Sequence, residues 1–265
     1  MNEMSELKVL QIETTNLCNS HCVFCVHDRI KEYENMSDEL FKKILNDAKK
    51  IETIKRIIPM MTGEPLMDKK FINRLKLING ILPNKQIEVY SNGSFLTSKI
   101  IKELASIENL TMFFSINGTS KKTRKKLMGL DDYDYVVKMV NLYALTEKPF
   151  RTIFVAHPSV KKEEFHNFIR SWSNKALIIP YANFIGEKYR SDTIEKTCVR
   201  AISHMTVMWN GKVNLCCFDA LGKVIFGDLN TQSIKEVWNS KKRQSYAKAH
   251  LNGEIIEPCN ICVYI

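Results

Sequence analysis

The sequence predicts an α/β fold in which a partial (β/α)6 TIM barrel, open on one side, precedes a small C-terminal domain made of a β-hairpin and a helix. Two observations predict it. Up to about residue 190, short apolar runs alternate with amphipathic stretches, a pattern typical of parallel strands joined by helices. After residue 190 the pattern changes to strand, turn, strand and helix. The predicted domains are therefore residues 1–190 and 191–265.

Six strand-like runs make up the predicted barrel, and helix-like runs lie between them. The strands are predicted at residues 8–14, 56–61, 86–90, 111–116, 151–156 and 176–181. Two helices have clear starts, one at Ser37 and one at Thr97 or Ser98, because these side chains can accept a hydrogen bond from the free amides of a first helical turn. Further helices are predicted at residues 133–145 and 165–172.

The C-terminal part begins with a predicted hairpin. Residues 207–209 and 212–216 are strand-like, and Asn210-Gly211 between them favours a tight hairpin turn. Residues 233–248 follow as one helical segment with an apolar face, and a short cysteine-bearing tail ends the chain.

Charge and cysteine usage limit the function classes. The 265 residues carry a formal charge of +10, which favours partners with anionic groups. The eight cysteines gather near the two ends of the chain, with none between Cys25 and Cys198, so they predict metal ligation in a reducing cytoplasm. No apolar run reaches the length of a membrane span, and residues 1–6 are too polar for a secretory signal.

The densest basic run is residues 121–126. It contains no aromatic side chain on which a base could stack, so a nucleic-acid partner is disfavoured. We interpret the run as the solvated face of a helix. The expected substrate is a small molecule that is anionic or polar.

Three cysteines stand close together after the first predicted strand. Cys18, Cys22 and Cys25 have CxxxCxxC spacing. A cubane iron–sulfur cluster normally takes four thiolates, so three thiolates from one loop leave one iron open to hold a reactant. A zinc knuckle with His21 or His27 as the fourth ligand is the alternative.

The cysteine spacing resembles the signature of radical S-adenosylmethionine (SAM) enzymes, and Phe24 matches the aromatic residue common before the third cysteine in that family. The resemblance implies that Cys18, Cys22 and Cys25 hold a [4Fe–4S] cluster. It also implies that the open iron binds S-adenosyl-L-methionine through its amino and carboxylate groups, and that an electron from the cluster cleaves it to a 5'-deoxyadenosyl radical.

Further loops resemble family motifs at the carboxyl ends of successive predicted strands, where the active sites of such barrels lie. Thr62-Gly63-Glu64-Pro65 follows the second strand and resembles the family's GGEP element, with Thr62 in place of the first glycine. The resemblance implies that Gly63 and Glu64 contact the amino group of SAM.

The next two strands are followed by similar matches. Ser91-Asn92-Gly93 resembles the family's TNG, whose polar side chain lies near the ribose. Ser115 resembles the serine of S-(L/I)-D-G, which contacts the ribose or the methionine carboxylate, and Asn117 replaces the usual aspartate. The resemblance therefore implies a SAM site that includes Ser91, Asn92, Ser115 and Asn117.

The C-terminal cysteines resemble the arrangement of the SPASM and twitch families. Gly211 lies twelve residues after Cys198 and four residues before Cys216, and Cys259-Asn260-Ile261-Cys262 closes the chain as a CxxC. The resemblance implies that Cys198, Cys216, Cys259 and Cys262 hold one auxiliary [4Fe–4S] cluster, the twitch form, which makes two clusters in all. A zinc site made of the same four thiolates is the alternative.

Among twitch proteins, the chain is most similar to the aminocyclitol (2-deoxy-scyllo-inosamine) dehydrogenase type. That similarity implies oxidation of an alcohol on a sugar, cyclitol or nucleotide sugar, with the auxiliary cluster accepting the second electron. An external donor such as flavodoxin or ferredoxin is expected to supply the first electron. Such enzymes usually act within biosynthetic gene clusters.

Cys217 is left over when the seven predicted cluster ligands are assigned. It is a small core residue, a thiol that donates a hydrogen atom as in radical epimerases, or a residue that takes the place of a cluster ligand. A peptide- or protein-modifying radical enzyme and a zinc-bearing nucleic-acid module are two further hypotheses. Polar residues expected to include part of the substrate site are Arg151, His157, Asn183, Glu187, Tyr189, Arg190 and Asp219.

Overall fold

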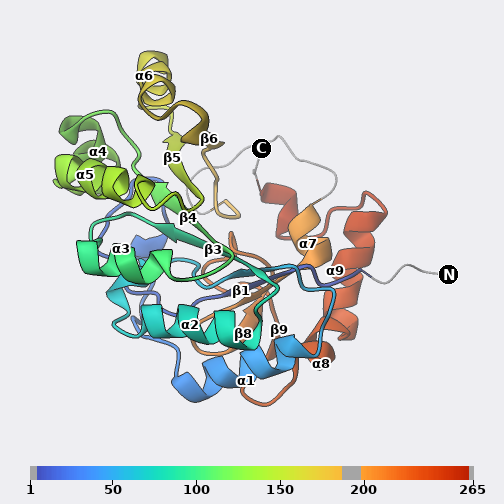
Figure 1. Ribbon diagram of the computed structural model, residues 1–265. Helices are drawn as coiled ribbons and strands as arrows, with labels where there is room; N and C mark the ends of the chain where they lie inside the picture. Colours follow the sequence, from blue (N-terminus) through green and yellow to red (C-terminus); the bar gives the residue numbers. More distant parts are fainter. Residues whose placement is uncertain (1–4, 187–197, 263–265) are drawn as a thin grey trace.

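The computed structural model describes residues 5–186 and 198–262, and it is built around one open nine-stranded sheet in the order β6-β5-β4-β3-β2-β1-β7-β8-β9 (Figure 1). The strands are β1 Val9–Ile12, β2 Arg56–Ile58, β3 Gln86–Ser91, β4 Leu110–Ser115, β5 Phe150–Ala156, β6 Ala176–Pro180, β7 His204–Val207, β8 Lys212–Asn214 and β9 Ile225–Asp228. Strands β1 to β6 are parallel, and each overlaps one of the six strands predicted from the sequence. The partial barrel is therefore confirmed.

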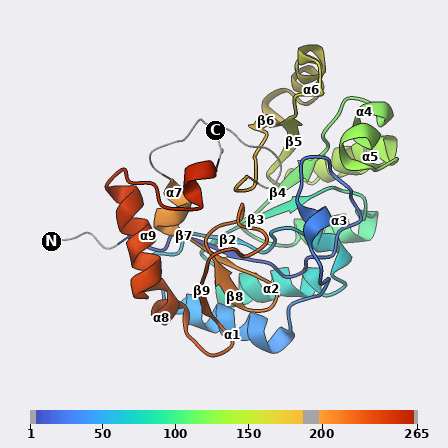
Figure 2. The same ribbon diagram turned by 180° about the vertical axis from the view of Figure 1, so that it is seen from behind.

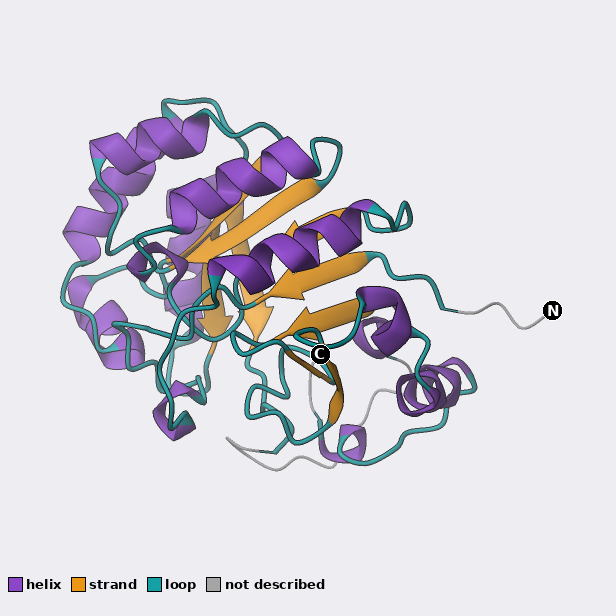
Figure 3. Ribbon diagram, turned by 90° about the horizontal axis from the view of Figure 1, so that it is seen from below, coloured by secondary structure: helices purple, strands orange, loops and turns teal. Residues whose placement is uncertain are grey.

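Helices connect the parallel strands and lie along one face of the sheet (Figure 3). They are α1 Asp38–Lys49, α2 Phe71–Ile81, α3 Ser98–Ala105, α4 Lys121–Met128, α5 Tyr133–Ala144 and α6 Lys162–Trp172. Short 3-10 turns are η1 His27–Arg29, η2 Pro65–Met67, η3 Ser173–Lys175 and η4 Cys259–Ile261. The predicted caps are confirmed, because Ser37 Oγ accepts from Leu40 N and Thr97 Oγ1 accepts from Ile100 N.

The C-terminal hairpin continues the barrel sheet. β7 pairs in parallel with β1, from Val9 opposite His204 to Ile12 opposite Val207, and β8 and β9 add antiparallel strands outside it. The first hairpin strand thus begins three residues before its predicted start at residue 207, because β1 supplies a pairing edge that local sequence does not reveal. Figure 2 shows α7, α8 and α9 at this side of the sheet, away from α4–α6.

The single helix predicted at residues 233–248 is wrong. The structure has α8 Ile234–Trp238 and α9 Lys241–Leu251, preceded in the C-terminal part by α7 Val199–Ser203. The helix breaks at Ser240, whose backbone is extended and whose Oγ accepts from Arg243 N, so Ser240 starts a new helix instead of continuing the first. The division into two domains at residue 190 remains a prediction, since that position lies outside the described residues.

A continuous apolar core lies between the helices and the outer face of the sheet. Phe41, Ile44 and Leu45 of α1 pack with Leu10 and Ile12 of β1 in this core. Burial of each such side chain contributes about 1.5–3 kcal/mol. The inner face of the sheet is left for a cavity. Among the described residues, no helix is long and apolar enough to cross a membrane.

Candidate active site

A cavity of about 520 Å³ occupies the inner face of the parallel sheet and reaches the carboxyl ends of its strands. Its volume lies in the range of small-molecule sites. Every residue predicted from the sequence to hold the first cluster or to contact SAM lines this cavity. These residues are Cys18, Cys22, Phe24, Cys25, Gly63, Glu64, Ser91, Asn92, Ser115 and Asn117.

Neighbouring backbone positions the cysteine loop. His21 N and Val23 N donate to Met128 O and Leu127 O, at 2.9 Å each, so the end of α4 fixes the middle of the loop. Burial, helped by the neighbouring cysteines, raises the pKa of Cys18 to about 11 and that of Cys22 higher still. Three such thiolates are stable only beside a cationic centre. The donor set therefore fits a cluster held by three thiolates.

The zinc alternative lacks a fourth ligand here. His21 is exposed, and His27 is buried with Nε2 2.7 Å from Asn16 O. Neither histidine lines the cavity with the three cysteines. In the part of the chain that the structure describes, no three His, Cys, Asp or Glu side chains are placed to hold one metal ion. Thiolates of a cubane cluster bind different irons and need no such convergence.

Gly63 brings the loop after β2 directly against the cysteine loop. A Cβ at this position would lie 2.4 Å from Thr15 O and 2.7 Å from Leu17 O, distances that no side chain tolerates. Glu64 N donates to Leu17 O at 2.8 Å across the same junction. The glycine is thus required for close approach, as its place in the GEP element suggests.

Thr62, the departure from the GGEP pattern, has a partner that the sequence did not reveal. Its backbone N donates to Glu13 Oε1 at 3.2 Å, and its hydroxyl donates to the same atom. Trp209 N donates to Glu13 Oε2 at 3.2 Å. Glu13 is buried, and burial raises the pKa of its carboxyl. This carboxyl therefore joins the loop after β2 to the C-terminal hairpin, where Trp209 lies 196 positions after Glu13.

Glu64 is buried and bonded to protein groups. Oε1 accepts from Leu66 N at 3.0 Å and from Ser91 Oγ at 2.8 Å, and Oε2 accepts from Asn92 N at 2.6 Å. Burial raises the pKa of the carboxyl to about 7, although these bonds lower it. The side chain holds the loops after β2 and β3 together.

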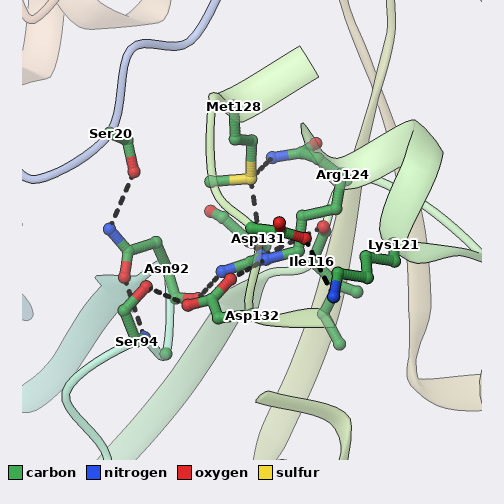
Figure 4. Close-up of polar contacts among 12 residues, drawn as sticks. Ser20, Asn92, Ser94, Ile116, Lys121, Arg124, Met128, Asp131 and Asp132 are labelled. Carbon is green, nitrogen blue, oxygen red and sulfur yellow. Dashed lines mark hydrogen bonds and ion pairs between the residues drawn. The ribbon is translucent and has the colours of Figure 1, made fainter. Parts of the chain in front are cut away.

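The asparagines of the two following loops are engaged in the same way. Asn92 Nδ2 donates to Ser20 Oγ at 2.9 Å (Figure 4). It also donates to Asn19 Oδ1 at 2.7 Å, and both acceptors belong to the cysteine loop. Asn117 Oδ1 accepts from Val155 N at 2.8 Å. Their contacts with SAM remain predictions, because the described bonds position loops.

The interpretation of residues 121–126 as a solvated face is wrong for one residue. Arg124 is 0 % exposed. Its Nε donates to Asp132 Oδ1 at 2.7 Å, Nη1 donates to Ser115 O at 3.0 Å, and Nη2 donates to Asn92 O at 2.8 Å (Figure 4). A guanidinium can bond several carbonyls in fixed directions, so Arg124 fixes the loops after β3 and β4 relative to each other.

The predicted auxiliary ligands gather around a second small core. Cys216, Cys259 and Cys262 pack with Ile185 and with neighbouring apolar residues. Burial, together with the nearby thiol of Cys198, raises the pKa of Cys259 to about 12 and that of Cys262 to about 11. All eight cysteines are free thiols. The four side chains therefore lie near one another and fit a shared cluster, which remains a prediction.

Cys217 lines the main cavity. The strand predicted to reach residue 216 ends at Asn214, and Cys217 lies in a turn after it. Burial raises the pKa of its thiol, and a hydrogen bond with Arg200 opposes the shift.

The predicted substrate residues that the structure describes do not line the cavity. Asn183 donates to Ile261 O at 2.6 Å, Asp219 accepts from Lys223 N at 2.7 Å, and neither lines the cavity. Arg151 and His157 also lie outside its lining. Predicted residues outside the described ranges are Glu187, Tyr189 and Arg190.

The sequence analysis missed several polar residues of the inner cavity wall, among them Arg56, Glu88, Tyr90, Arg200 and His204. Arg56, Glu88 and Tyr90 could have been found, because polar or aromatic side chains at alternate positions of a strand share one face of the sheet.

Comparisons with known proteins agree with this geometry. The model of the Radical SAM superfamily matches residues 12–171, and the SPASM model, an iron–sulfur cluster-binding domain, matches residues 198–263. The S-adenosyl-L-methionine-dependent 2-deoxy-scyllo-inosamine dehydrogenase of Niallia circulans is 20% identical over 260 residues, which cover 95% of this chain and 92% of that protein.

Another similar relative is the tungsten-containing aldehyde ferredoxin oxidoreductase cofactor-modifying protein of Pyrococcus furiosus, 30% identical over 112 residues. This match covers 42% of the chain and 31% of that relative, so it spans less than a third of the relative's length.

Two crystal structures have similar folds. BtrN in complex with AdoMet and 2-DOIA has a TM-score of 0.66 at 18% identity, covering 99% of this chain and 95% of that one. SuiB of Streptococcus suis bound to S-adenosylmethionine has a TM-score of 0.74 at 15% identity, covering 91% of this chain and 67% of that one.

Proposed function

Since the chain belongs to the radical SAM superfamily, we propose that it oxidises an alcohol on a small polar substrate such as a sugar, cyclitol or nucleotide sugar, using S-adenosylmethionine and two [4Fe–4S] clusters. The observation that carries the proposal is one cavity lined by all three cysteines of the first group and by a neighbour of the second group. Cys18, Cys22 and Cys25 line it on one side, and Cys217, the chain neighbour of Cys216, lines it as well. The likeness to a dehydrogenase over 95% of the chain supports the same reaction.

The two cysteine groups would hold different clusters. Cys18, Cys22 and Cys25 would hold the first, and Cys198, Cys216, Cys259 and Cys262 would hold the second. When bound, SAM and the first cluster supply hydrogen abstraction at the substrate carbon, and the second cluster supplies an acceptor for the remaining electron.

The residues around the cysteine loop would prepare the cofactor site. Gly63 lets the loop after β2 approach the cysteine loop, and Glu64 ties that loop to Ser91 and Asn92. Arg124 fixes the loop that carries Ser115. Because these bonds join protein groups to one another, they hold the loops in fixed positions, which lowers the entropic cost of binding.

Iron analysis and product analysis of the anaerobically reconstituted protein test the proposal. We expect about eight irons per chain, as two [4Fe–4S] clusters require. With its alcohol substrate, the enzyme should form 5'-deoxyadenosine and ketone in equal amounts. Stoichiometric zinc without cluster absorbance would contradict the proposal.

Epimerisation is a second candidate function, because Cys217 lines the cavity where a hydrogen donor is needed. A thiol donor would return a hydrogen atom to the substrate carbon on the face opposite the abstraction, and an external electron and proton would then restore the thiol. Solvent deuterium at that carbon of the product would favour this function over oxidation.

A further inference from the structure

Two arginines and a histidine from elements far apart in the sequence line one part of the cavity. Arg56 begins β2, His204 begins β7, and both pair in register with Val9 of β1, one from each side. Register partners in a sheet point to the same face, so both side chains stand on the cavity face with Cα atoms about 10 Å apart. Arg200, on the helix that leads into β7, lines the same cavity.

Protein groups satisfy the guanidinium of Arg56 only in part. Its Nη1 donates to Glu88 Oε1 at 2.9 Å, and the hydroxyl of Tyr90 donates to Glu88 Oε2 at 3.3 Å. Arg56 Nε is buried and has no hydrogen-bond partner among residues 5–186 and 198–262. A buried donor without an acceptor costs free energy, so the described residues do not stabilise this guanidinium fully.

The charges around His204 favour an anion. Arg56 and Arg200 carry positive charge; Glu88 pairs with Arg56, and Arg200 forms a hydrogen bond with the thiol of Cys217. Burial together with the charges of Arg200 and Arg56 lowers the pKa of His204 to about 4. Its Nδ1 lies 3.1 Å from Ser203 Oγ. Two guanidinium groups beside the imidazole of His204 suit a ligand that brings negative charge.

We propose that Arg56, Arg200 and His204 form a subsite for an anionic group of the substrate, a phosphate or a carboxylate. The identification of the ligand as the substrate rests on the proposed function. The binding of an anion at this place does not depend on it.

The subsite lies at the start of the strands, whereas the cysteine loop lies at their carboxyl ends. Gln86 is the register partner of Arg56, and Ser91 lies five residues farther along β3, which corresponds to about 16 Å. The rings of Tyr90 and Phe113, stacked with centroids 4.4 Å apart, also line the cavity. A sugar-sized alcohol held by its anion at Arg56 would therefore extend toward the cysteine loop along an aromatic wall.

Calorimetric titration of the reconstituted enzyme with SAM bound tests the subsite. The probes are glucose 6-phosphate, gluconate, glucose and glucosamine. We expect an anionic probe to bind at least tenfold more tightly than glucose or glucosamine, and the tighter of the two anions identifies phosphate or carboxylate. Arg56→Gln and Arg200→Gln should each weaken binding of that probe about tenfold, the loss expected for a charged hydrogen bond.

Arg170→Gln is the matched control, because it removes the same charge from an exposed position on α6; anion affinity should not change. If Arg56→Gln does not fold, the same titrations are made with Arg200→Gln and with Arg56→Lys, which keeps the charge. Unchanged affinity in the arginine variants would overturn the proposal. Preference for glucosamine, lost in Glu88→Gln, would overturn it too and would indicate an amine substrate. Ketone formation from a neutral polyol without anion binding would overturn the subsite alone and leave the proposed oxidation in place.

Discussion

At the scale of single residues, Cys217 decides between two reactions. A dehydrogenase removes a second electron and needs no hydrogen donor, whereas an epimerase needs a thiol at the substrate. Cys217 lines the cavity, but burial raises the pKa of its thiol and Arg200 bonds it. We expect Cys217→Ala to keep most activity, with 5'-deoxyadenosine and ketone still formed in equal amounts. A diverted product from this variant would instead support the epimerase.

Glu64 gives a second prediction at this scale. Glu64→Ala removes a buried carboxyl that accepts bonds from Leu66, Ser91 and Asn92, and it leaves their donors unpaired. We expect SAM affinity to fall at least tenfold while both clusters stay in place. Equilibrium binding of SAM and iron analysis measure the two quantities. Equal SAM affinity in wild type and variant would show that this carboxyl does not prepare the site.

At the scale of elements, the loops after the strands depend on one glycine. Gly63→Ala would place a Cβ 2.4 Å from Thr15 O and push the loop after β2 away from the cysteine loop. We expect weaker SAM binding and a lower melting temperature. Gly80→Ala in α2 is the matched control: a Cβ there meets nothing within 4 Å, so the change should stabilise the helix by about 1 kcal/mol. Similar effects of the two changes would refute the argument.

The basic run at residues 121–126 contains one buried structural residue, Arg124, among exposed lysines. Arg124→Met leaves Asp132 and three backbone carbonyls without their buried partner, and we expect a loss of about 3–5 kcal/mol in the free energy of unfolding. Lys122→Met, from the exposed part of the same helix, should change it by less than about 0.5 kcal/mol. Denaturant unfolding of both variants measures the difference, and equal losses would argue against a special role for Arg124.

At the scale of the whole molecule, the C-terminal part is joined to the barrel by its sheet. β7 covers the edge of β1, Trp209 N bonds Glu13, and Trp238 Nε1 donates to Ser5 O at 3.0 Å. A chain ending at residue 190 would expose β1 as an edge strand. We therefore expect this fragment to aggregate, whereas the full chain should unfold in one transition. A soluble fragment with its own cooperative transition would establish two independent domains.

The sequence by itself determined the order of the parallel strands and the position of the cysteine loop and the three motif loops at their carboxyl ends. These features are local: an apolar run predicts a strand, and a contiguous motif predicts the loop that follows it. Ser37 and Thr97 were identifiable as caps for the same reason, because each bonds an amide three residues away.

Only the tertiary structure decided what joins distant segments. The pairing of β7 with β1 places His204 and Arg56 on either side of Val9, although 148 positions separate them in the sequence. The bond from Trp209 to Glu13 has the same origin. Such contacts depend on sheet register and on burial, which act between chain segments that local patterns cannot relate. The inner wall of the cavity, where specificity is expected to arise, is for this reason a property of the fold.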